Sequence, residues 1–488
     1  MTSQNKLHIA SKKLLSALIL TSILLLTLCS TLEVVIAAPL PRGVIRIMQD
    51  GTVEGTNKIS QNGNIYTLTE DLNSAVQDGS TFINIECDGI IFDGAGKTLK
   101  GTGGIAIGAS GRHNITIKNT QVIDFGTGIE LCDDIIYDSN GQAGIITPSG
   151  NRIVDNYFET KYWAISLRGV REFVSGNTFI TKSDKAIEFW TNETTFIDNK
   201  FIDCGLFLMD DPSNGLNVIS ANTVNGKPLV FLEGQSNQVI DNADQVILIN
   251  CTNMVIQNID NLGLSQPVQL LGIINTTITN CKTHITLTNS NNNTITNNKI
   301  TAAFITLTNS NNNTISNNEL SAVKYSAVRL YDSSKNMITQ NLIEGEYGGG
   351  IIICGNSEYN RVEKNTISYR SGGDTGSGIA VSGGKYNYIY ENNITAENTG
   401  IGLDGIEYNV VFNNNVYQGK TSLSLFGSRY NDVFGNNFVD ASGYAVHLLM
   451  SDYNNFFYNS FEGNTKVTEI HIDTLLNSTY YSEYNKWD

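Results

Sequence analysis

The sequence predicts an all-β protein built as a parallel β-helix, on the strength of two observations. First, a six-residue phrase, Asn-x-(Ile/Val/Phe)-x-x-Asn, recurs with successive starts mostly 20 to 24 residues apart, and a repeat of that length is typical of a solenoid. Second, apolar and polar residues alternate within the copies as in a β-strand, whereas the apolar spacing of three and four that a helix requires is missing. We therefore expect about sixteen stacked coils of short strands and turns.

The best copies show why asparagine recurs. Residues 285–298 and 305–318 differ at one of fourteen positions. Asparagine suits the corner of a coil, because it tolerates left-handed backbone angles and its amide bonds to nearby backbone. Stacked asparagines then form a ladder, in which each amide donates to one neighbouring coil and accepts from the other. Clear copies begin at Asn151, Asn217, Asn237, Asn253, Asn293, Asn313, Asn336, Asn360, Asn387, Asn409, Asn431 and Asn454.

The composition limits the class of partner. The chain has 488 residues, of which 16% are charged, and its formal net charge is −16. This acidity argues against nucleic-acid binding, which needs a basic surface. It also disfavours polyanionic substrates unless calcium bridges the two partners, so calcium is the one cofactor that the composition leaves open. The cysteines lie at different offsets in their coils, and we expect free thiols rather than disulfides.

The N-terminus has the pattern of a secretory signal. Three lysines precede the apolar run 14–28, and the small residues Ala37 and Ala38 stand just before Pro39. We therefore predict a signal peptide over residues 1–38 and a secreted or cell-surface, extracytoplasmic protein. An uncleaved anchor is the alternative, and this segment would then be the only membrane contact.

Three further regions are expected after the signal. Residues 39–80 form a lead-in and N-terminal cap, and residues 81–464 form the β-helix. Residues 465–488 form a tail in which the repeat fades before the chain stops at Asp488. This abrupt end suggests that a C-terminal part is missing.

The repeats resemble a known family. Residues 92–101 (Phe-Asp-Gly-Ala-Gly-Lys-Thr-Leu-Lys-Gly), residues 114–119 (Asn-Ile-Thr-Ile-Lys-Asn) and the copies that follow are similar to NosD-like right-handed parallel β-helix proteins, whose repeats are of the carbohydrate-binding and sugar-hydrolase type. The resemblance covers roughly residues 43–464. It implies an exported, right-handed β-helix with a pectin lyase-like fold and, through NosD itself, a periplasmic accessory role in copper delivery.

The residues themselves do not support a copper site. Copper favours histidine, methionine or cysteine side chains that cluster in space. The four histidines beyond the signal, His113, His284, His447 and His471, are far apart in the sequence. We therefore predict no metal site, and copper delivery stays a distant alternative.

One candidate surface follows from aligning successive coils. When the inward pairs Ile165/Leu167, Ile187/Phe189, Leu206/Leu208 and Val230/Leu232 are superposed, the alternate residues face outward in rows roughly 5 Å apart. Aromatic faces suit sugar rings, and carboxylates accept hydrogen bonds from sugar hydroxyls. The substrate-binding candidates are Tyr162, Trp163, Trp190, Phe207, Phe231 and Glu233, and the catalytic candidates are Arg168, Glu188, Asp210 and Asp211.

This surface leaves two classes of function open. The first is a non-catalytic scaffold or adhesin that binds extended polysaccharide or a cell-surface glycan. The second is a polysaccharide lyase or glycoside hydrolase that works on the outer face of the β-helix with its carboxylates and Arg168. The motifs of polygalacturonases and alginate epimerases are missing; Asp211-Pro212, for example, is followed by Ser213 and not by histidine. We therefore favour the scaffold.

Overall fold

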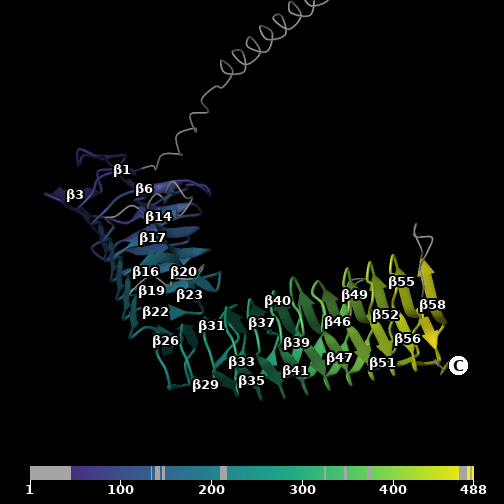
Figure 1. Cartoon of the computed structure of the whole chain (residues 1–488). Coiled ribbons are helices and arrows are strands. Elements are labelled where there is room, and N and C mark those ends of the chain that lie inside the picture. The colour runs from purple at the N-terminus through teal and green to yellow at the C-terminus, as the bar shows by residue number, and fades with distance from the viewer. Residues whose placement is uncertain are drawn as a thin grey trace, which may run out of the picture.

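The computed structural model describes residues 45–132, 135–137, 143–145, 149–208, 217–323, 326–345, 349–370, 376–471, 481–483 and 486–487. All regular elements in these ranges are short strands, stacked into a right-handed parallel β-helix of about 16 turns (Figure 1). The predicted fold class is therefore confirmed. The predicted signal, residues 1–38, lies outside these ranges, and the part of the chain that they cover has no helix with the length and apolarity needed to cross a membrane.

The first half of the solenoid, here the N-terminal arm, begins with β1 (Ile45–Ile47). One of its sheets, here sheet A, runs from β1 through β6 (Thr81–Ile85), β9 (Ile105–Gly108), β12 (Thr127–Cys132), β17 (Trp163–Val170) and β20 (Lys185–Asn192) to β23 (Gly205–Leu208). Ile129, Ile165, Ile187 and Leu206 pair from coil to coil and are at most 1% exposed. They form one inward column of the core.

Two further sheets complete this arm. One runs from β3 (Ile59–Asn62) to β24 (Val218–Ser220), and the other from β5 (Leu72–Asn73) to β25 (Thr223–Val224). The second half of the solenoid, here the C-terminal arm, also has three rows. They run from β26 (Lys227–Glu233) to β58 (Lys466–His471), from β27 (Val239–Asp241) to β59 (Tyr481–Glu483), and from β36 (Lys299–Thr301) to β60 (Lys486–Trp487).

Buried asparagines stack into ladders, as predicted. In the N-terminal arm, Nδ2 of Asn156, Asn177 and Asn199 donates to Oδ1 of the ladder asparagine one coil further on, at 2.9–3.1 Å. The backbone N–H of each of these residues donates to the same oxygen. The C-terminal arm has two such ladders, which run from Asn293 to Asn454 and from Asn298 to Asn459. The ladders thus pair polar groups that would be costly to bury alone.

The left-handed residue at each corner is the one that precedes the ladder asparagine. Asn292 has a φ of 59°, whereas the ladder residue Asn293 is 1% exposed. The copies that begin at Asn237 and Asn253 are shifted by one residue. Their first asparagine takes the left-handed position, with φ of 58° and 53°, and is exposed. In the shifted frame Nδ2 of Asn253 donates to Oδ1 of Asn237 at 3.2 Å on the surface. The repeated phrase therefore covers two different frames, and only one of them builds a buried ladder.

The solenoid is not one straight rod, because its two arms meet at an elbow formed by residues 223–249 (Figure 1). β25 and β26 are joined by Asn225-Gly226, whose φ values are 48° and 82°. Positive φ at both positions is what a tight two-residue hairpin requires. β26 therefore runs antiparallel to β25, with Thr223 opposite Pro228. The hairpin ends sheet A at β23 and starts a new stack of coils.

The elbow also divides the apolar interior into two clusters. One core cluster belongs to each arm, and β28 (Gln245–Ile249) lies between them. Val246 and Leu248 pack into the C-terminal cluster, Ile247 and Ile249 pack into the N-terminal one, and all four are 0% exposed. A strand buried on both faces is an uninterrupted apolar run, without the alternation seen elsewhere in the chain.

Two glutamines cover the open edge of sheet A. Leu206, in the last strand, bonds through its backbone to the side chain of Gln245. Gln269, in β31 (Val268–Leu271), accepts from the N–H of Leu208 at 3.2 Å and donates to the carbonyl of Leu206 at 3.1 Å. Both glutamines are buried. The C-terminal arm thus satisfies backbone groups that an uncovered strand edge would leave unpaired.

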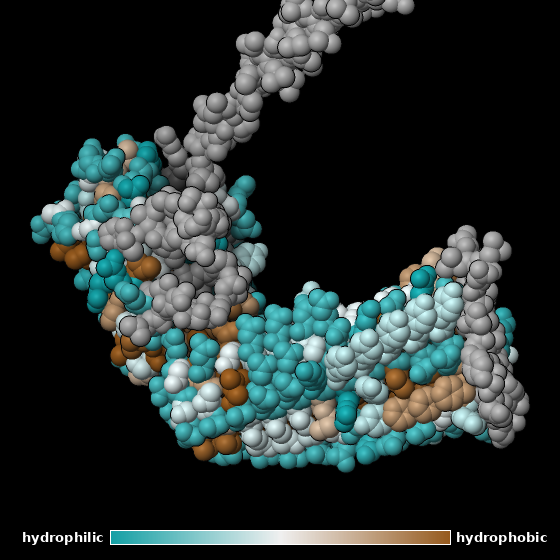
Figure 2. Space-filling view, viewed as in Figure 1, coloured by the Kyte–Doolittle hydropathy of each residue, from teal (hydrophilic) through white to brown (hydrophobic). Residues whose placement is uncertain are grey.

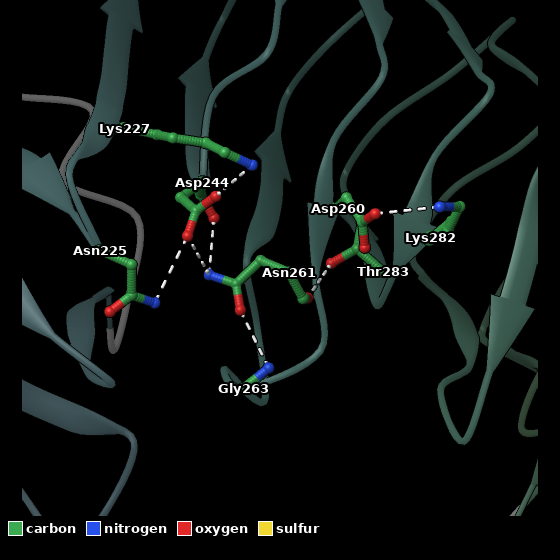
Figure 3. A network of polar contacts seen from close by, with 8 residues as sticks. All are labelled: Asn225, Lys227, Asp244, Asp260, Asn261, Gly263, Lys282 and Thr283. Carbon is green, nitrogen blue, oxygen red and sulfur yellow. Dashed lines mark hydrogen bonds and ion pairs between the residues drawn. The ribbon is translucent and has the colours of Figure 1, made fainter.

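A polar network ties the hairpin to the first coils of the C-terminal arm (Figure 3). Asp244, which is 5% exposed, forms an ion pair with Lys227 in which Nζ and Oδ1 are 3.1 Å apart. Nδ2 of Asn225 and Nδ2 of Asn261 each donate to Oδ2 of Asp244 at 3.4 Å. Thr283 donates through Oγ1 to the carbonyl of Asn261 at 2.7 Å. The elbow is therefore a packed joint in which hydrogen bonds link three successive coils.

Candidate functional site

The predicted surface lies on the outer face of sheet A, where three of its four strands align as expected. Ser166 pairs with Glu188, and Glu188 pairs with Phe207. Arg168 pairs with Trp190 in the neighbouring row. The sequence alignment of these coils thus gave the observed register for Arg168, Glu188 and Phe207.

The fourth strand does not belong to this face. β26 pairs with β28, and Phe231 lies opposite Ile247. Phe231 is 8% exposed and packs into the N-terminal core. Its predicted outward orientation is therefore wrong, because β26 lies between the two cores: Val230 and Leu232 pack against the C-terminal cluster, and Phe231 packs into the N-terminal one. Glu233, on the same strand, pairs with Ile249 and so does not extend the row of Glu188.

The remaining predicted residues are only partly described. Asp210 and Asp211 lie outside the described residues, and so does the side chain of Trp190. Tyr162 is 52% exposed, and Trp163 is half-buried beside Thr127. These two aromatic residues stand at the beginning of β17.

Two further contacts change the chemistry of this face. Nζ of Lys185 lies 3.7 Å from the ring centroid of Phe207, so an ammonium group covers the ring that was expected to stack on a sugar. Glu130, which sequence reasoning missed, pairs with Ser166 in the same row as Glu188. Glu130 and Glu188 are two coils apart, which is about 10 Å at the usual strand spacing. Both carboxylates are half-buried.

The C-terminal arm carries a feature outside the predicted set, a column of five stacked tyrosines. Tyr359, Tyr386, Tyr408, Tyr430 and Tyr453 occupy the same corner of successive coils. Neighbouring ring centroids are 5.1–5.7 Å apart, and the rings are inclined by 8–20°. Each tyrosine is 37–46% exposed. We call this column the tyrosine ladder. Because its rings stack on one another along the arm, their edges are left to face outward.

Every residue of the tyrosine ladder has a left-handed backbone, with φ between 55° and 60°. The same corner in earlier coils holds Asn292 and Asn312, with φ of 59° and 57°. Asparagine tolerates this conformation, whereas for a bulky side chain it is a true outlier that costs roughly 1–2 kcal/mol. Left-handed corners occur along the whole solenoid, for example at Lys335. The ladder is therefore a candidate site because five large side chains with hydroxyl groups are exposed there in register.

A second aromatic column runs beside the tyrosine ladder, four residues further along each coil. Tyr390, Phe412, Phe434 and Phe457 stack with centroids 4.6–5.1 Å apart and ring planes inclined by 8–12°. They end the strands β47 (Tyr388–Tyr390), β50 (Val410–Phe412), β53 (Asp432–Phe434) and β56 (Asn455–Phe457). We call them the phenylalanine column. Figure 2 shows a pale row and a tan, apolar row running in parallel along the C-terminal arm.

Between the two columns lies a strip formed by the outward residues Tyr388, Val410, Asp432 and Asn455. The columns are four positions apart along a chain that turns at the tyrosine, so at most about 13 Å separates them. Nδ2 of Asn455 donates to Oδ1 of Asp432 at 2.8 Å. Three of the four residues have shorter side chains than the aromatic residues on either side, so the strip is a floor between two aromatic borders, polar at Asp432 and Asn455 and apolar at Val410.

Charges beside the tyrosine ladder are paired. Lys385 and Glu407 form an ion pair at 2.9 Å, Arg429 and Asp452 at 3.6 Å, and Lys364 and Glu391 at 3.6 Å. Nζ of Lys385 also lies 5.5 Å from the ring centroid of Tyr408. These three ion pairs therefore add no net charge beside the ladder.

A sequence signal for the tyrosine ladder exists. Tyrosine directly precedes the first asparagine of the last five copies of the phrase, whereas asparagine or lysine does so in the three copies that begin at residues 293, 313 and 336. Reading the phrase one residue earlier would have revealed the column. The phenylalanine column follows from the same copies, because an aromatic residue stands three positions after that asparagine in the last four of them.

The described residues do not fit a copper site. Among them, no group of three or more His, Cys, Asp or Glu side chains could hold a metal ion. His284 accepts the N–H of Phe304 through Nδ1 at 3.2 Å, and the two rings are 4.4 Å apart. This histidine is thus engaged within the fold. Calcium stays a prediction of the composition.

Comparison with solved structures returns other β-helix proteins at low identity. The periplasmic alginate epimerase AlgG is 9% identical, with 88% of this chain and 80% of that chain covered and a TM-score of 0.36. An exopolygalacturonase from Thermotoga maritima is 11% identical, with 75% and 84% covered and a TM-score of 0.29. The mannuronan C-5 epimerase AlgE4 A-module from Azotobacter vinelandii is 10% identical, with 66% and 88% covered and a TM-score of 0.25. No curated protein matches the chain.

The family comparison is more extensive. The family described as "Periplasmic copper-binding protein (NosD)" matches residues 235–371 and 370–487. Together these segments span 253 of the 488 residues, which is just over half of the chain. The protein therefore belongs to the NosD family of right-handed parallel β-helix proteins.

Proposed function

We propose that this protein is an extracytoplasmic scaffold that binds extended polysaccharide without transforming it. The binding surface is the strip between the tyrosine ladder and the phenylalanine column. The observation that carries this proposal is the tyrosine ladder, with five exposed rings held in register at left-handed corners. Export is supported by the signal pattern of residues 1–38 and by the periplasmic description of the family.

The chemistry of the strip suits a sugar polymer. A polysaccharide offers hydroxyls along its edges and C–H groups on its ring faces, so it needs a surface that combines hydrogen-bonding groups with apolar area. Tyrosine supplies both with few rotatable bonds, which keeps the entropy lost on binding small. The phenylalanine column adds an apolar border, and Asp432 and Asn455 add polar groups on the floor.

The strip favours binding over catalysis. Glycoside hydrolysis needs two carboxyl groups placed on either side of the scissile bond. The four residues that form the floor include one carboxylate, Asp432, which accepts a hydrogen bond from Asn455. We therefore expect the bound glycan to leave this surface unchanged.

Affinity electrophoresis against a panel of soluble polysaccharides tests the proposal, with reducing-sugar and unsaturated-uronate assays run in parallel. We expect retarded migration with at least one polysaccharide and no product. The double variant Tyr408→Asn/Tyr430→Asn should lose the retardation, whereas Arg168→Ala/Glu188→Ala on sheet A should keep it. Free migration with every polysaccharide would contradict the proposal.

A hydrolase that uses sheet A is the second candidate. The observation in its favour is the row Glu130–Ser166–Glu188, in which two half-buried carboxylates stand two coils apart. That separation, about 10 Å, is near the upper end of the range for inverting glycosidases. Release of reducing ends that stops in Glu130→Gln and in Glu188→Gln would favour this function over the scaffold.

A further inference from the structure

We infer that the strip binds an uncharged, unbranched polysaccharide of equatorially linked pyranose rings, lying along the C-terminal arm with about one ring per coil. This inference rests on the proposed function and specifies its ligand. It follows from the spacing and orientation of the aromatic rings and from the charge of the residues around them.

The spacing comes from the ladder itself. Neighbouring tyrosine rings are 5.1–5.7 Å apart over five successive coils. One pyranose ring with its glycosidic oxygen spans a comparable length when the chain is extended through equatorial bonds. Such a polymer presents a hydroxyl beside every coil. A polymer that winds into a helix would lose this match after one or two coils.

The orientation of the rings decides which contacts they make. Each inner tyrosine, such as Tyr408, has a stacked neighbour on both faces, Tyr386 and Tyr430. The ring faces are therefore occupied, and the exposed part of the ladder is its row of edges and phenolic groups. We assign the hydroxyls of this row to hydrogen bonds with one edge of the glycan. The phenylalanine column borders the other edge with apolar contacts.

The charge of the surroundings selects against polyuronates. The three ion pairs beside the ladder leave their cations already matched by carboxylates. Arg361, which stands outward in the first coil of the ladder, shares that coil with Glu358 and Glu363. The chain as a whole carries a formal charge of −16. A polyanion would thus be repelled without gaining a basic surface in return.

The ladder has a definite length, so binding should depend on the length of the glycan. Each added ring gains one more coil of contacts until the glycan spans the five tyrosines from Tyr359 to Tyr453. Beyond that point an extra ring finds no further tyrosine. Affinity should therefore rise from the disaccharide to about the pentasaccharide or hexasaccharide and then level off.

Isothermal titration calorimetry with defined oligosaccharides tests this inference. The probes are neutral β-(1→4)-linked glucose, mannose and xylose oligosaccharides from the disaccharide to the octasaccharide, and oligomannuronates of the same lengths. We expect a length-dependent, saturating affinity for a neutral series and at least tenfold weaker binding of the oligomannuronates. Affinity that is independent of length, or tighter binding of the charged series, would overturn the inference.

Two variants distinguish the contribution of the phenolic hydroxyls to binding from that of the aromatic rings. Tyr386→Phe/Tyr408→Phe/Tyr430→Phe keeps the stack and removes three phenolic groups, and we expect it to bind at least tenfold more weakly than the wild type. The matching Asn variant takes the residue that this chain itself uses at Asn292 and Asn312, so it should fold and fail to bind. Wild-type affinity in the Phe variant would overturn the hydroxyl assignment. Thermal unfolding of both variants, compared with the wild type, establishes that they are folded.

The outcomes distinguish this inference from the proposed function. If no polysaccharide of any kind binds, the proposed function fails as well. If polysaccharide binds but the Phe and Asn variants bind normally, polysaccharide binding stands, whereas the strip as its surface and the present inference both fall. A dimer in sedimentation velocity that dissociates in the Asn variant, without glycan binding, would assign the strip to a second copy of the chain.

Discussion

The side chain of Gln245 makes the two hydrogen bonds with the backbone of Leu206 that a neighbouring strand would otherwise make. Its Oε1 accepts the backbone N–H of Leu206 at 3.0 Å, and its Nε2 donates to the carbonyl of the same residue at 2.7 Å. The two residues belong to different arms and are 39 positions apart in the chain. A neighbouring strand would make the same two bonds, so one side chain covers the edge at which sheet A stops.

Replacing Gln245 with alanine should therefore destabilise the elbow. The N–H of Leu206 loses its partner in a site where Gln245 is 1% exposed, which should cost about 1–3 kcal/mol, because a buried donor left unpaired is expensive. Chemical denaturation should show the loss, and hydrogen exchange at Leu206 should become faster. Gln238→Ala, at an exposed position, is the control and should change stability by less than about 0.5 kcal/mol. Equal effects of the two variants would contradict the proposed edge cover.

Replacing Tyr408 with asparagine should leave stability almost unchanged. The variant loses two ring contacts, worth about 0.5–1.5 kcal/mol each. It also removes a bulky residue from a left-handed corner, a strain of roughly 1–2 kcal/mol. These effects nearly cancel, so we expect a net change within about 1 kcal/mol. Tyr408→Val is the matched comparison, because it loses the contacts but keeps the strain, and thermal unfolding should show it to be clearly less stable. A large loss of stability in the asparagine variant would mean that the ladder mainly supports the fold.

Stability should depend on the protonation of His284. Burial lowers the pKa of this histidine below its ordinary value, and the charge of Asp184 opposes the shift in part. In the unfolded chain the pKa is about 6.5. Because the unfolded state then binds more protons than the folded state, the contribution is complete above about pH 6.5 and is lost as the pH falls through the lower, folded-state pKa.

His284→Asn tests this dependence, because the amide oxygen can still accept the N–H of Phe304 but does not titrate. The free energy of unfolding, measured between pH 7.5 and pH 4.5, should fall more steeply in the wild type than in the variant. Parallel curves for the two proteins would show that His284 does not contribute.

Buried cysteines should be unreactive in the native protein. All six cysteines of the described chain are free thiols. Burial raises the pKa of Cys204 and that of Cys281 to about 11, and it also raises the pKa of Cys251. Since the thiolate is the reactive form, these three should react with Ellman's reagent at pH 8 only after denaturation. Rapid native labelling of any of them, located by mass spectrometry, would contradict the packing of its coil.

The candidate site was predictable only in part. The alignment that placed Arg168, Glu188 and Phe207 on one face used strand periodicity, and that rule held as long as each coil followed the one before it. It failed at Phe231, because the alignment assumed that β26 stacks on β23. The cover of Phe207 by Lys185 was also beyond sequence reasoning, since it depends on the path of one flexible side chain.

Short sequence patterns indicate a hairpin and a buried strand at the elbow, but they do not predict which strands these pair with. Asn225-Gly226 is a strong hairpin signal, and residues 246–249 form an apolar run without alternation. Neither feature says which strand the reversed chain will join. That choice depends on whether both faces of β28 can be buried at once and whether Gln245 and Gln269 can reach the edge of sheet A.

By itself, the sequence determined the length of the coil, its alternating strands and the asparagine ladders. Each of these features depends on equivalent positions of successive coils stacking on one another, and such positions recur in the sequence at the period of the repeat. Only the tertiary structure decided where the stack is interrupted and which residues the interruption buries. These properties arise from contacts at the elbow between coils that are not equivalent, and a repeating pattern does not predict such contacts.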